Sequence, residues 1–420
     1  MYSCIRRGCR ISCRTTSHPV RPCRVCLQSW IPNDPASPRP ALHGGTGEGR
    51  GPSRSPSYFQ QEEAAGGRVR AYLDYNATAP LRVEARQAMI AAMDVVGNPS
   101  SVHSEGRAAK ALVERAREQV AQAVGCQVAE VVFTSGATEA ARVLEGFSDV
   151  RVPPTAHDAL WAHHQPGSGT DTVLAMGLAN SETGIVTEPH KGAEGWSADG
   201  HAGNLLLLDI TQAVGRLPFV FSWSGADLAI LSGHKLGGPK GVGALIVRRG
   251  FDIPALSLGG GQEMGRRSGT ENIIGIAGLG AAIEAAMQDL SNGVWERVEK
   301  LRNILETSLE ARANKTIFVG KGVARLPNTS CFITDGWKGE TQVMQMDLAG
   351  FAISAGSACS SGKVRESRVL RAMGFDAGQA ASAVRVSLGP ATTEDEVLRF
   401  VQAWQSKEQK FRARTEQGAA

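Results

Sequence analysis

The chain has 420 residues, of which 42% are hydrophobic and 20% are charged, and its formal net charge at pH 7 is +4. This composition excludes a fibrous or wholly disordered protein and predicts a soluble enzyme of two lobes. The small charge and the lack of a long Lys/Arg stripe in the body argue against nucleic acid as the partner. Because the four leucines 205–208 stop at Asp209, well short of the roughly 20 apolar residues of a membrane span, we also expect no membrane partner.

Residues 1–69 differ in composition from the rest, being rich in Arg, Ser, Pro and Gly, with no acidic residue before Asp34. We expect this segment to be disordered, or to be a spurious extension. An Arg-rich, acid-poor start is also typical of an organelle transit peptide, so the expected cytoplasmic location has the mitochondrial matrix as its alternative. Outside this segment lie three scattered cysteines, Cys126, Cys331 and Cys359, as expected in a reducing compartment.

From Ala71 onward the pattern is that of alternating helices and strands. Ala108, Leu112, Ala116, Val120 and Val124 recur every four residues, which predicts a helix leading into a short buried strand at 131–133. Further apolar runs at 172–176, 205–208 and 228–231 each end in a polar or Gly-rich turn. Such runs are typical of a mostly parallel sheet, whose ligands bind at the carboxyl ends of the strands.

A second region begins near Gly293, where an amphipathic helix is followed by strand-like segments at 330–333, 352–354 and 384–386. The pair Thr393 and Glu396 forms a capping box that predicts the start of a final helix. We therefore predict an α/β protein with a segment 70–88 that joins the small domain. A large domain at 89–290 and a small α+β domain at 291–420 would follow.

The most informative segment is 232–241, with the sequence Ser-Gly-His-Lys-Leu-Gly-Gly-Pro-Lys-Gly after an apolar run. A lysine between a strand and a Gly-rich turn can be partly desolvated, so that its neutral amine forms a Schiff base. Taken alone, Lys235 is more simply explained as an exposed turn lysine. Asp209 at a strand end can pair with a protonated pyridine nitrogen and Gln212 with a ring hydroxyl, although an Asp there also commonly caps a helix.

The turn 134–139 joins a predicted strand to a helix, so Ala137 and Thr138 offer donors to a phosphate group at a positive helix N-terminus. Ser, Gly and Thr are common in any such turn, and this motif is weak by itself.

Together these residues resemble the cysteine desulfurases, which are pyridoxal-phosphate enzymes of fold type I in the class-V aminotransferase family. The resemblance is to the branch of cysteine desulfurases that serves iron-sulfur cluster assembly and nitrogen fixation. The resemblance runs from Tyr72 to about Trp404. It rests on segments 72–80, 97–101, 135–139, 209–212, 232–241 and 259–270. It implies a large domain with a mostly parallel sheet and a smaller α+β C-terminal domain.

The resemblance also assigns roles to residues. Lys235 would carry pyridoxal phosphate, with Asp209 and Gln212 as ring partners, and His157 would stack on the ring and assist proton transfer. The implied remaining cofactor contacts are Ala137, Thr138, Ser181, Ser232, Gly233 and His234, with Thr270 reaching the phosphate from a neighbouring subunit of a homodimer. Arg385 would hold the substrate carboxylate, and Asn180 would also contact substrate.

Cys359 lies in a run of small residues, 354–362. Such a run favours a mobile loop, which would let the thiol reach a buried substrate and then carry the sulfur to the protein surface. The alternative is that Cys359 is a buried structural cysteine. The resemblance makes Cys359 the persulfide-forming nucleophile. We expect no intrinsic metal site, with Cys359 a candidate ligand of a transient iron-sulfur cluster shared with a scaffold protein. Cys126 and Cys331 fit no motif and are expected to be packing residues.

Three features depart from the family pattern. Ser181 replaces the second of two paired asparagines, and Thr155-Ala156-His157 lacks the acidic residue that commonly precedes the histidine. The intervals from Thr138 to His157 and from His157 to Asn180, of 19 and 23 residues, are shorter than the family's. Contacts at Ser181 and the role of His157 are therefore the least secure.

The predicted activity is conversion of L-cysteine to L-alanine with transfer of sulfur to Cys359, supplying iron-sulfur assembly through an acceptor or scaffold protein. A selenocysteine lyase or another pyridoxal-phosphate enzyme of this fold is one alternative. A degenerate, non-catalytic assembly subunit is the other.

Overall fold

The computed structural model describes residues 63–64, 68–169, 171–311, 316–356 and 366–419. Most of the predicted N-terminal extension, and Cys359 with residues 357–362 of its predicted loop, lie outside these residues. The first two residues of that predicted loop, Ser354 and Ala355, form a strand. Within the extension, β1 (Glu63–Ala64) pairs with β2 (Arg68–Val69) in an antiparallel ribbon. The predicted disorder is therefore wrong for these four positions, because backbone pairing with each other gives them a regular structure.

A six-stranded sheet forms the centre of the larger part, in the order β4-β12-β11-β10-β6-β5. Its strands are β4 (Val131–Thr134), β5 (Asp149–Arg151), β6 (Thr172–Gly177), β10 (Leu205–Asp209), β11 (Leu228–Ser232) and β12 (Gly243–Val247). Strand β10 runs parallel to β6 and β11, and β5 runs parallel to β6, whereas β12 is antiparallel to both neighbours. The predicted mostly parallel sheet is confirmed; the buried strands β5 and β12 were not predicted.

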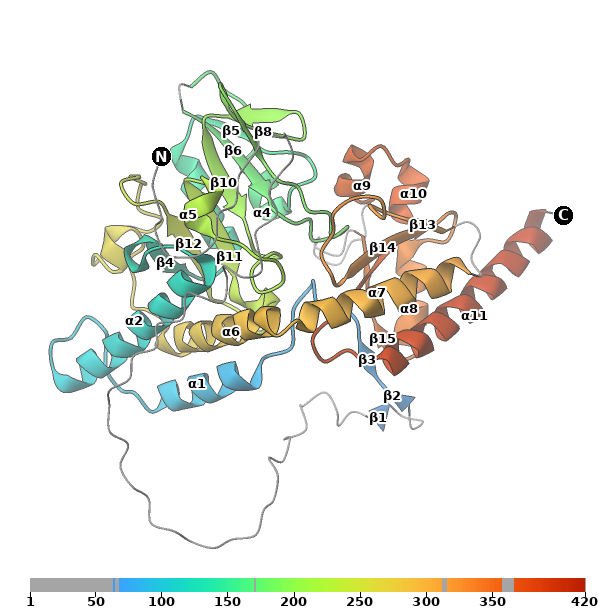
Figure 1. Cartoon of the computed structure of the whole chain (residues 1–420), viewed down its shortest axis with the longest axis horizontal. Helices are drawn as coiled ribbons and strands as arrows, with labels where there is room; N and C mark the ends of the chain where they lie inside the picture. The colour runs from blue at the N-terminus through green and yellow to red at the C-terminus, as the bar shows by residue number, and fades with distance from the viewer. Residues whose placement is uncertain (1–62, 65–67, 170, 312–315, 357–365, 420) are drawn as a thin grey trace, which may run out of the picture. The chain divides into compact units, whose positions relative to one another are not determined.

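Three long helices lie together beside this sheet: α1 (Val83–Met93), α2 (Ser104–Val124) and α6 (Ile273–Ser291) (Figure 1). Gly280 of α6 permits close packing, because a Cβ there would lie 2.8 Å from the Cα of Ala116 in α2. Helix α6 is long and apolar enough to cross a membrane by length and composition, but it packs against both α1 and α2. A core helix of a soluble protein passes the same test, so this is weak evidence for a span.

A four-stranded sheet, β13-β14-β17-β16, organises the C-terminal part together with α7 (Val294–Glu310) and α11 (Glu394–Ala419). Its strands are β13 (Thr316–Phe318), β14 (Thr329–Thr334), β16 (Ser354–Ala355) and β17 (Ala383–Ser387). The predicted capping box is present, since the Glu396 carboxylate accepts from the Thr393 N–H at 2.8 Å and the Glu396 N–H donates to the Thr393 hydroxyl at 3.3 Å.

The predicted strand 352–354 is wrong as one element. Residues here form β15 (Phe351–Ala352), which pairs with β3 (Ala71–Tyr72), and then β16, which pairs with β17. The chain changes partner sheet at Ile353, which local hydrophobicity does not reveal. Because β3 pairs with β15, the segment after β3 runs beside the C-terminal sheet before α1 packs on α6.

The remaining elements are short. They are α3 (Ala137–Ala140), α4 (Asp158–Trp161), α5 (Phe221–Ser224), α8 (Gly339–Asp347), α9 (Arg368–Ala372), α10 (Ala377–Ala381) and the ribbon β7 (His190–Gly192), β8 (Gly195–Ala198) and β9 (His201–Gly203). Separate hydrophobic clusters surround the two main sheets. The predicted domain boundaries stay predictions.

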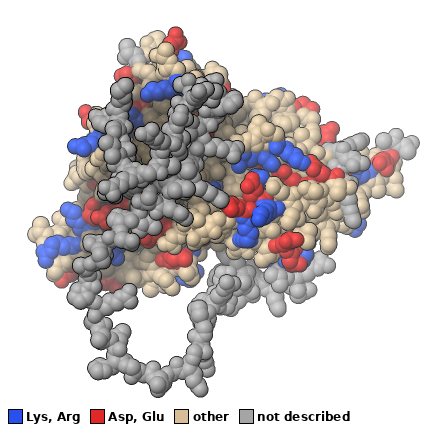
Figure 2. Space-filling model, in the orientation of Figure 1, with Lys and Arg blue, Asp and Glu red and all other residues tan. Residues whose placement is uncertain are grey.

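Charged side chains of both signs are mixed on the surface. Figure 2 shows acidic and basic residues interspersed among uncharged ones on one face of the molecule, wherever that face is not drawn in grey. This mixture agrees with the small formal net charge of +4. The visible face therefore has the character expected of a protein whose ligands are held in a cavity rather than along a charged stripe.

Candidate active site

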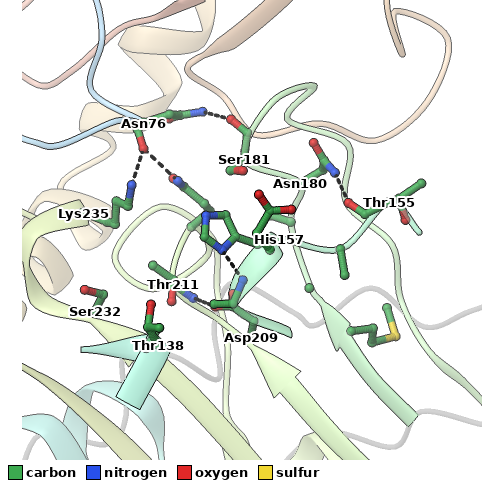
Figure 3. A pocket seen from close by; sticks show the side chains of 18 of the residues that line it. Asn76, Thr138, Thr155, His157, Asn180, Ser181, Asp209, Thr211, Ser232 and Lys235 are labelled. Atoms are coloured by element: carbon green, nitrogen blue, oxygen red, sulfur yellow. Dashed lines mark hydrogen bonds between the residues drawn. The ribbon is translucent and has the colours of Figure 1, made fainter. Parts of the chain in front are cut away.

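A cavity of about 950 Å³ lies at the carboxyl ends of β10 and β11. It is lined by eleven residues that the sequence singled out: Ala137, Thr138, His157, Asn180, Ser181, Asp209, Gln212, Ser232, His234, Lys235 and Arg385. Figure 3 shows several of these side chains facing a common space. Three predicted residues do not line it: Gly233 is buried behind the Lys235 turn, Thr270 is exposed, and Cys359 lies outside the described residues.

Lys235 stands at the end of a 3₁₀ turn, Gly233–Lys235, that directly follows β11. Its ammonium donates to the carbonyl oxygens of Asn76 at 2.9 Å and Ala77 at 2.7 Å. Gly237 follows with a φ of +91°, a conformation that favours glycine. The turn thus presents the lysine amine to the cavity beside carbonyl groups of the N-terminal segment.

The end of β10 supplies three polar residues to the same cavity. The Asp209 carboxylate accepts from the Thr211 N–H at 2.9 Å, so it stabilises its own turn while facing the cavity. The Thr211 hydroxyl is buried without a hydrogen-bond partner among the described residues. The Gln212 amide donates to the Asn76 carbonyl at 3.0 Å. Since buried hydroxyls normally find partners, Thr211 points to a ligand in this cavity.

The strand-to-helix turn after β4 forms one end of the cavity. Gly136 has a φ of +154°, and the N–H groups of Ala137 and Thr138 follow it at the start of α3. The Glu139 carboxylate accepts from the Ser135 N–H at 2.5 Å and pairs with Arg267 at 2.9 Å, which holds the turn in place. Free N–H groups at such a turn suit a phosphate.

His234 completes this end. Burial, with Lys235 and Lys240 nearby, lowers the pKa of His234 to about 4, so its imidazole is neutral at pH 7. Its Nδ1 lies 3.1 Å from the Thr78 hydroxyl. With a neutral His234 ring, the charge of a bound phosphate would be balanced by N–H donors and by the neighbouring lysines.

His157 also lines the cavity, and its ring is labelled in Figure 3. It is the N-cap of α4, and its Nδ1 accepts from the Ala159 N–H at 3.1 Å. The neutral ring therefore carries its proton on Nε2. The structure brings His157 into the same cavity as Lys235 although 78 residues separate them in the sequence.

Arg385 of β17 is almost wholly buried, with 2% of its surface exposed. Its guanidinium donates to the Asp74 carboxylate at 2.8 Å and to the Ser181 carbonyl at 3.0 Å. Its Nε is buried without a hydrogen-bond partner among the described residues. A substrate carboxylate at Arg385 would therefore share the guanidinium with Asp74.

The side chain of Asn180 is already used by the fold. Its Oδ1 accepts from the N–H groups of Glu182 and Thr183, both at 2.9 Å, and its amide donates to the Thr155 carbonyl at 2.8 Å. The predicted substrate contact of Asn180 remains a prediction, because the structure gives this amide a role in joining two loops.

Comparison with known proteins adds an independent observation. The aminotransferase class-V family model matches residues 71–147 and 168–400. A cysteine desulfurase of Cereibacter sphaeroides is 38% identical over 372 residues, covering 79% of this chain and 94% of that protein. This chain belongs to the cysteine desulfurase family.

Other family members show the same relationship. A cysteine desulfurase of a Frankia strain is 38% identical over 376 residues, covering 78% of this chain and 88% of that protein. The solved structure of a NifS-like protein from Rickettsia africae superposes with a TM-score of 0.71 at 28% identity, covering 80% of this chain and 99% of that one. The family match leaves out residues 148–167, a stretch that contains His157.

Asn76 is a residue of the site that the sequence analysis missed. It is 1% exposed, and its Oδ1 accepts from Arg216 at 2.9 Å and from Asn328 at 3.1 Å. Its backbone carbonyl accepts from both Lys235 and Gln212. Asn76 lies inside the quoted family segment 72–80, so its position was available as a signal but its partners were not.

Arg216 was also missed. Its guanidinium donates to the Asn76 side chain, to the Gln212 side chain at 2.5 Å and to the Lys235 carbonyl at 2.8 Å. Burial, and then the nearby Arg385, lowers the pKa of Arg216 to about 9. A buried cation held by neutral oxygen atoms is costly unless every acceptor is well placed, so this contact set must be well ordered.

Cys126 and Cys331 have the properties of packing residues. Burial raises the pKa of each thiol to about 12, so neither forms the reactive thiolate at neutral pH. Of the body cysteines, this leaves Cys359, outside the described residues, as the candidate nucleophile.

Proposed function

We propose that the chain converts L-cysteine to L-alanine and transfers the sulfur to Cys359 as a persulfide. The carrying observation is the convergence of Lys235, Asp209, the phosphate-binding turn and Arg385 on one cavity, in a chain 38% identical to curated cysteine desulfurases. Each of these groups is contributed by a different segment, and their meeting is a property of the fold.

Pyridoxal phosphate fits the residues present. The Thr211 hydroxyl and the Arg385 Nε, which have no hydrogen-bond partner among the described residues, support a bound ligand in this cavity. Lys235 would bond the cofactor, Asp209 would face its ring nitrogen, and the turn at Ala137 and Thr138 would hold its phosphate. The cofactor, when bound, supplies an electron sink for the substrate's α-carbon.

The chain's own residues supply binding, proton transfer and sulfur acceptance. Arg385 would hold the substrate carboxylate through its planar donors. Lys235 would take the proton from the α-carbon, and His157, with its proton on Nε2, lies across the same cavity. The Cys359 thiolate would form a sulfur-sulfur bond as the substrate's carbon-sulfur bond breaks. The electron pair stays with the three-carbon fragment, which is protonated and leaves as alanine.

A decisive experiment compares wild type with Cys359→Ser, using L-cysteine as substrate. We expect wild type to release alanine and to carry a protein persulfide, whereas Cys359→Ser should keep its cofactor absorbance and lose nearly all turnover. Full alanine production by Cys359→Ser, with sulfide released directly, would favour the selenocysteine-lyase alternative. A wild-type protein that binds no cofactor would favour the non-catalytic alternative.

A homodimer is proposed from the position of Thr270. Thr270 is exposed. Its segment is held against β4 by Glu263, whose carboxylate accepts from the Phe133 N–H at 2.8 Å and also from Arg117 of α2 in two bonds of 2.7 Å each. Val96, Val102 and Leu258 are each at least 88% exposed, leaving apolar surface for a second copy to cover. In the dimer, Thr270 would complete the partner's phosphate site.

Mixed dimers test this arrangement. Co-expressed Lys235→Ala and Thr270→Ala chains should regain about a quarter of wild-type activity, because half of the randomly paired dimers contain one intact site. Neither variant expressed alone should reach this level of activity. Activity that stays at the level of Thr270→Ala alone would show that each site uses its own Thr270.

Iron-sulfur cluster assembly is the proposed destination of the sulfur, with a scaffold protein as acceptor and as the source of any transient cluster at Cys359. The direct measurement loads the protein with radiolabelled sulfur and follows transfer of the persulfide sulfur to a cluster scaffold protein. The proposed location is the cytoplasm, with the mitochondrial matrix as the alternative. The mass of the native N-terminus distinguishes them, since import would remove the Arg-rich segment.

A further inference from the structure

Arg368 connects two sides of the cavity that are far apart in the sequence. It is the first residue of α9, and the cavity is also lined by Ala372 and Met373 at the other end of that helix. Its side chain reaches residues 153–158, a segment that lines the cavity and carries His157. These two segments are more than 200 residues apart, so their contact is purely tertiary.

The contacts of Arg368 use the full width of its guanidinium. It donates to the carbonyl of Pro154, to the carbonyl of Ala156 at 2.8 Å and to the carboxylate of Asp158 at 2.6 Å. Its guanidinium carbon also lies 4.8 Å from the centre of the Trp161 ring. A planar fork with five donors can satisfy three acceptors at once, which an ammonium cannot do in this geometry.

The three acceptors lie on either side of the histidine. Ala156 and Asp158 flank His157 directly, and the His157 ring in turn caps α4 through Ala159. This segment falls within residues 148–167, which the family model does not match. The backbone on both sides of His157 is therefore held by Arg368.

The solvent exposure of the Arg368–Asp158 ion pair indicates that it positions the loop rather than stabilising the fold. The side chains of Arg368 and Asp158 are 29% and 62% exposed. An ion pair so open to solvent contributes little to the free energy of unfolding. Its effect is to hold a short loop in one conformation, which matters most where a ring must face a reacting group.

We propose that Arg368 is a positioning residue that holds the His157 ring at the cofactor and substrate. This rests on the proposed function, since it names a residue that prepares the same site. Arg368 itself touches no reacting atom; it acts through the backbone on each side of His157.

A second connection limits how far the segment can move. The Asn180 amide donates to the Thr155 carbonyl, and the neighbouring Glu182 accepts from the Ser367 hydroxyl at 2.5 Å. Ser367 directly precedes Arg368, so both connections meet at the start of α9. Removal of Arg368 should therefore loosen the segment and displace the ring without unfolding it.

The test is a double-mutant cycle on Arg368→Ala and His157→Gln in full-length holoenzyme. Two quantities are measured for each variant: kcat for alanine release, and the dissociation constant of pyridoxal phosphate titrated into the apoprotein. Arg371→Ala is the matched control, because Arg371 lies on the same helix and its guanidinium donates to the Phe375 carbonyl and pairs with Glu366, away from residues 153–158.

We expect Arg368→Ala to lower kcat about tenfold and to weaken cofactor binding several-fold, while KM for cysteine changes little. The reason is that displacement of the His157 ring by about 1 Å is enough to slow the reaction. In the His157→Gln background the same substitution should have almost no further effect. Arg368→Lys should recover part of the loss, and Arg371→Ala should match wild type.

Equal losses from Arg368→Ala in both backgrounds would overturn the proposal, as would a lowered Tm with unchanged kcat and cofactor affinity. Inactive wild-type protein would instead count against the proposed function. In that case the cofactor titrations still decide whether Arg368 and His157 are coupled.

Discussion

The two sides of the cavity are built differently. On one side, which we call the floor, Lys235, Asp209 and Gln212 follow directly from the ends of β10 and β11. On the other, which we call the wall, residues 153–158 and 367–373 are loops and short helices joined by side-chain contacts. The floor derives its geometry from backbone pairing in a sheet, and the wall derives its geometry from a few long-range hydrogen bonds.

The two sides also differ in their buried charges. The floor contains the buried cation of Arg216, held by oxygen atoms of Asn76, Gln212 and Lys235. Glu182 contacts the wall by accepting a hydrogen bond from the Ser367 hydroxyl. Burial raises the pKa of Glu182 to about 7, although that hydroxyl and nearby arginines act to lower it. We infer that Glu182 gives the wall a response to pH near neutrality.

The largest effect is expected from Lys235→Ala, which removes the reactive group of the floor. Alanine production should fall on the order of 10⁴-fold or more, because the same lysine bonds the cofactor and moves the proton. In wild type, borohydride reduction and peptide mapping should place the cofactor on Lys235. An adduct on Lys240, the other lysine that lines the cavity, would contradict the assignment.

An intermediate effect is expected from Arg216→Met, which tests whether the floor depends on its buried cation. The Gln212 side-chain oxygen and the Lys235 carbonyl lose the donor that Arg216 supplies, whereas the Asn76 Oδ1 keeps its bond from Asn328. Each unsatisfied buried group costs about 1–3 kcal/mol, partly offset by relief of the buried charge. We expect a Tm lower by several degrees and a cofactor dissociation constant raised roughly tenfold. Arg248→Met is the control, since the Arg248 side chain is 40% exposed and contacts the Ala226 carbonyl. Equal Tm values for the two variants would refute a special role for Arg216.

The smallest effect is expected from Glu182→Gln and appears only in its pH dependence. The pKa of Glu182 is about 7 in the folded protein, above its ordinary value of 4.5. Between these values the folded state binds more protons than the unfolded state, so this group's contribution to stability falls as pH rises and is constant above about 8. The amide that replaces the carboxyl group in the variant cannot titrate.

As pH rises from about 5 to about 8, the Tm of wild type should therefore fall relative to the Tm of Glu182→Gln. Thermal melts of both proteins in matched buffers are the measurement. Parallel Tm curves across this range would show that the carboxyl is ionised throughout, and that the wall has no pH response at this position.

The sequence predicted the floor better than the wall for a physical reason. Apolar runs ending at Asp209 and before Lys235 reveal strand ends, and parallel strands bring their carboxyl ends together. By contrast, the sequence did not predict that the Asn180 amide bonds Thr155 and its own turn, while its predicted substrate contact remains a prediction. A side chain that joins two loops lies in no periodic sequence pattern, so its partner cannot be predicted from the sequence.

By itself the sequence determined the α/β class, four strands of the central sheet, the capped final helix and the family, because hydrophobic periodicity and short turn motifs are encoded by neighbouring residues. The tertiary structure alone decided that Asn76 joins Arg216 across 140 positions and that Arg368 reaches Ala156 across 212. It also divided the predicted strand at 352–354 between two sheets. Such contacts depend on how distant segments pack, and no local pattern of polarity specifies which buried donor meets which acceptor.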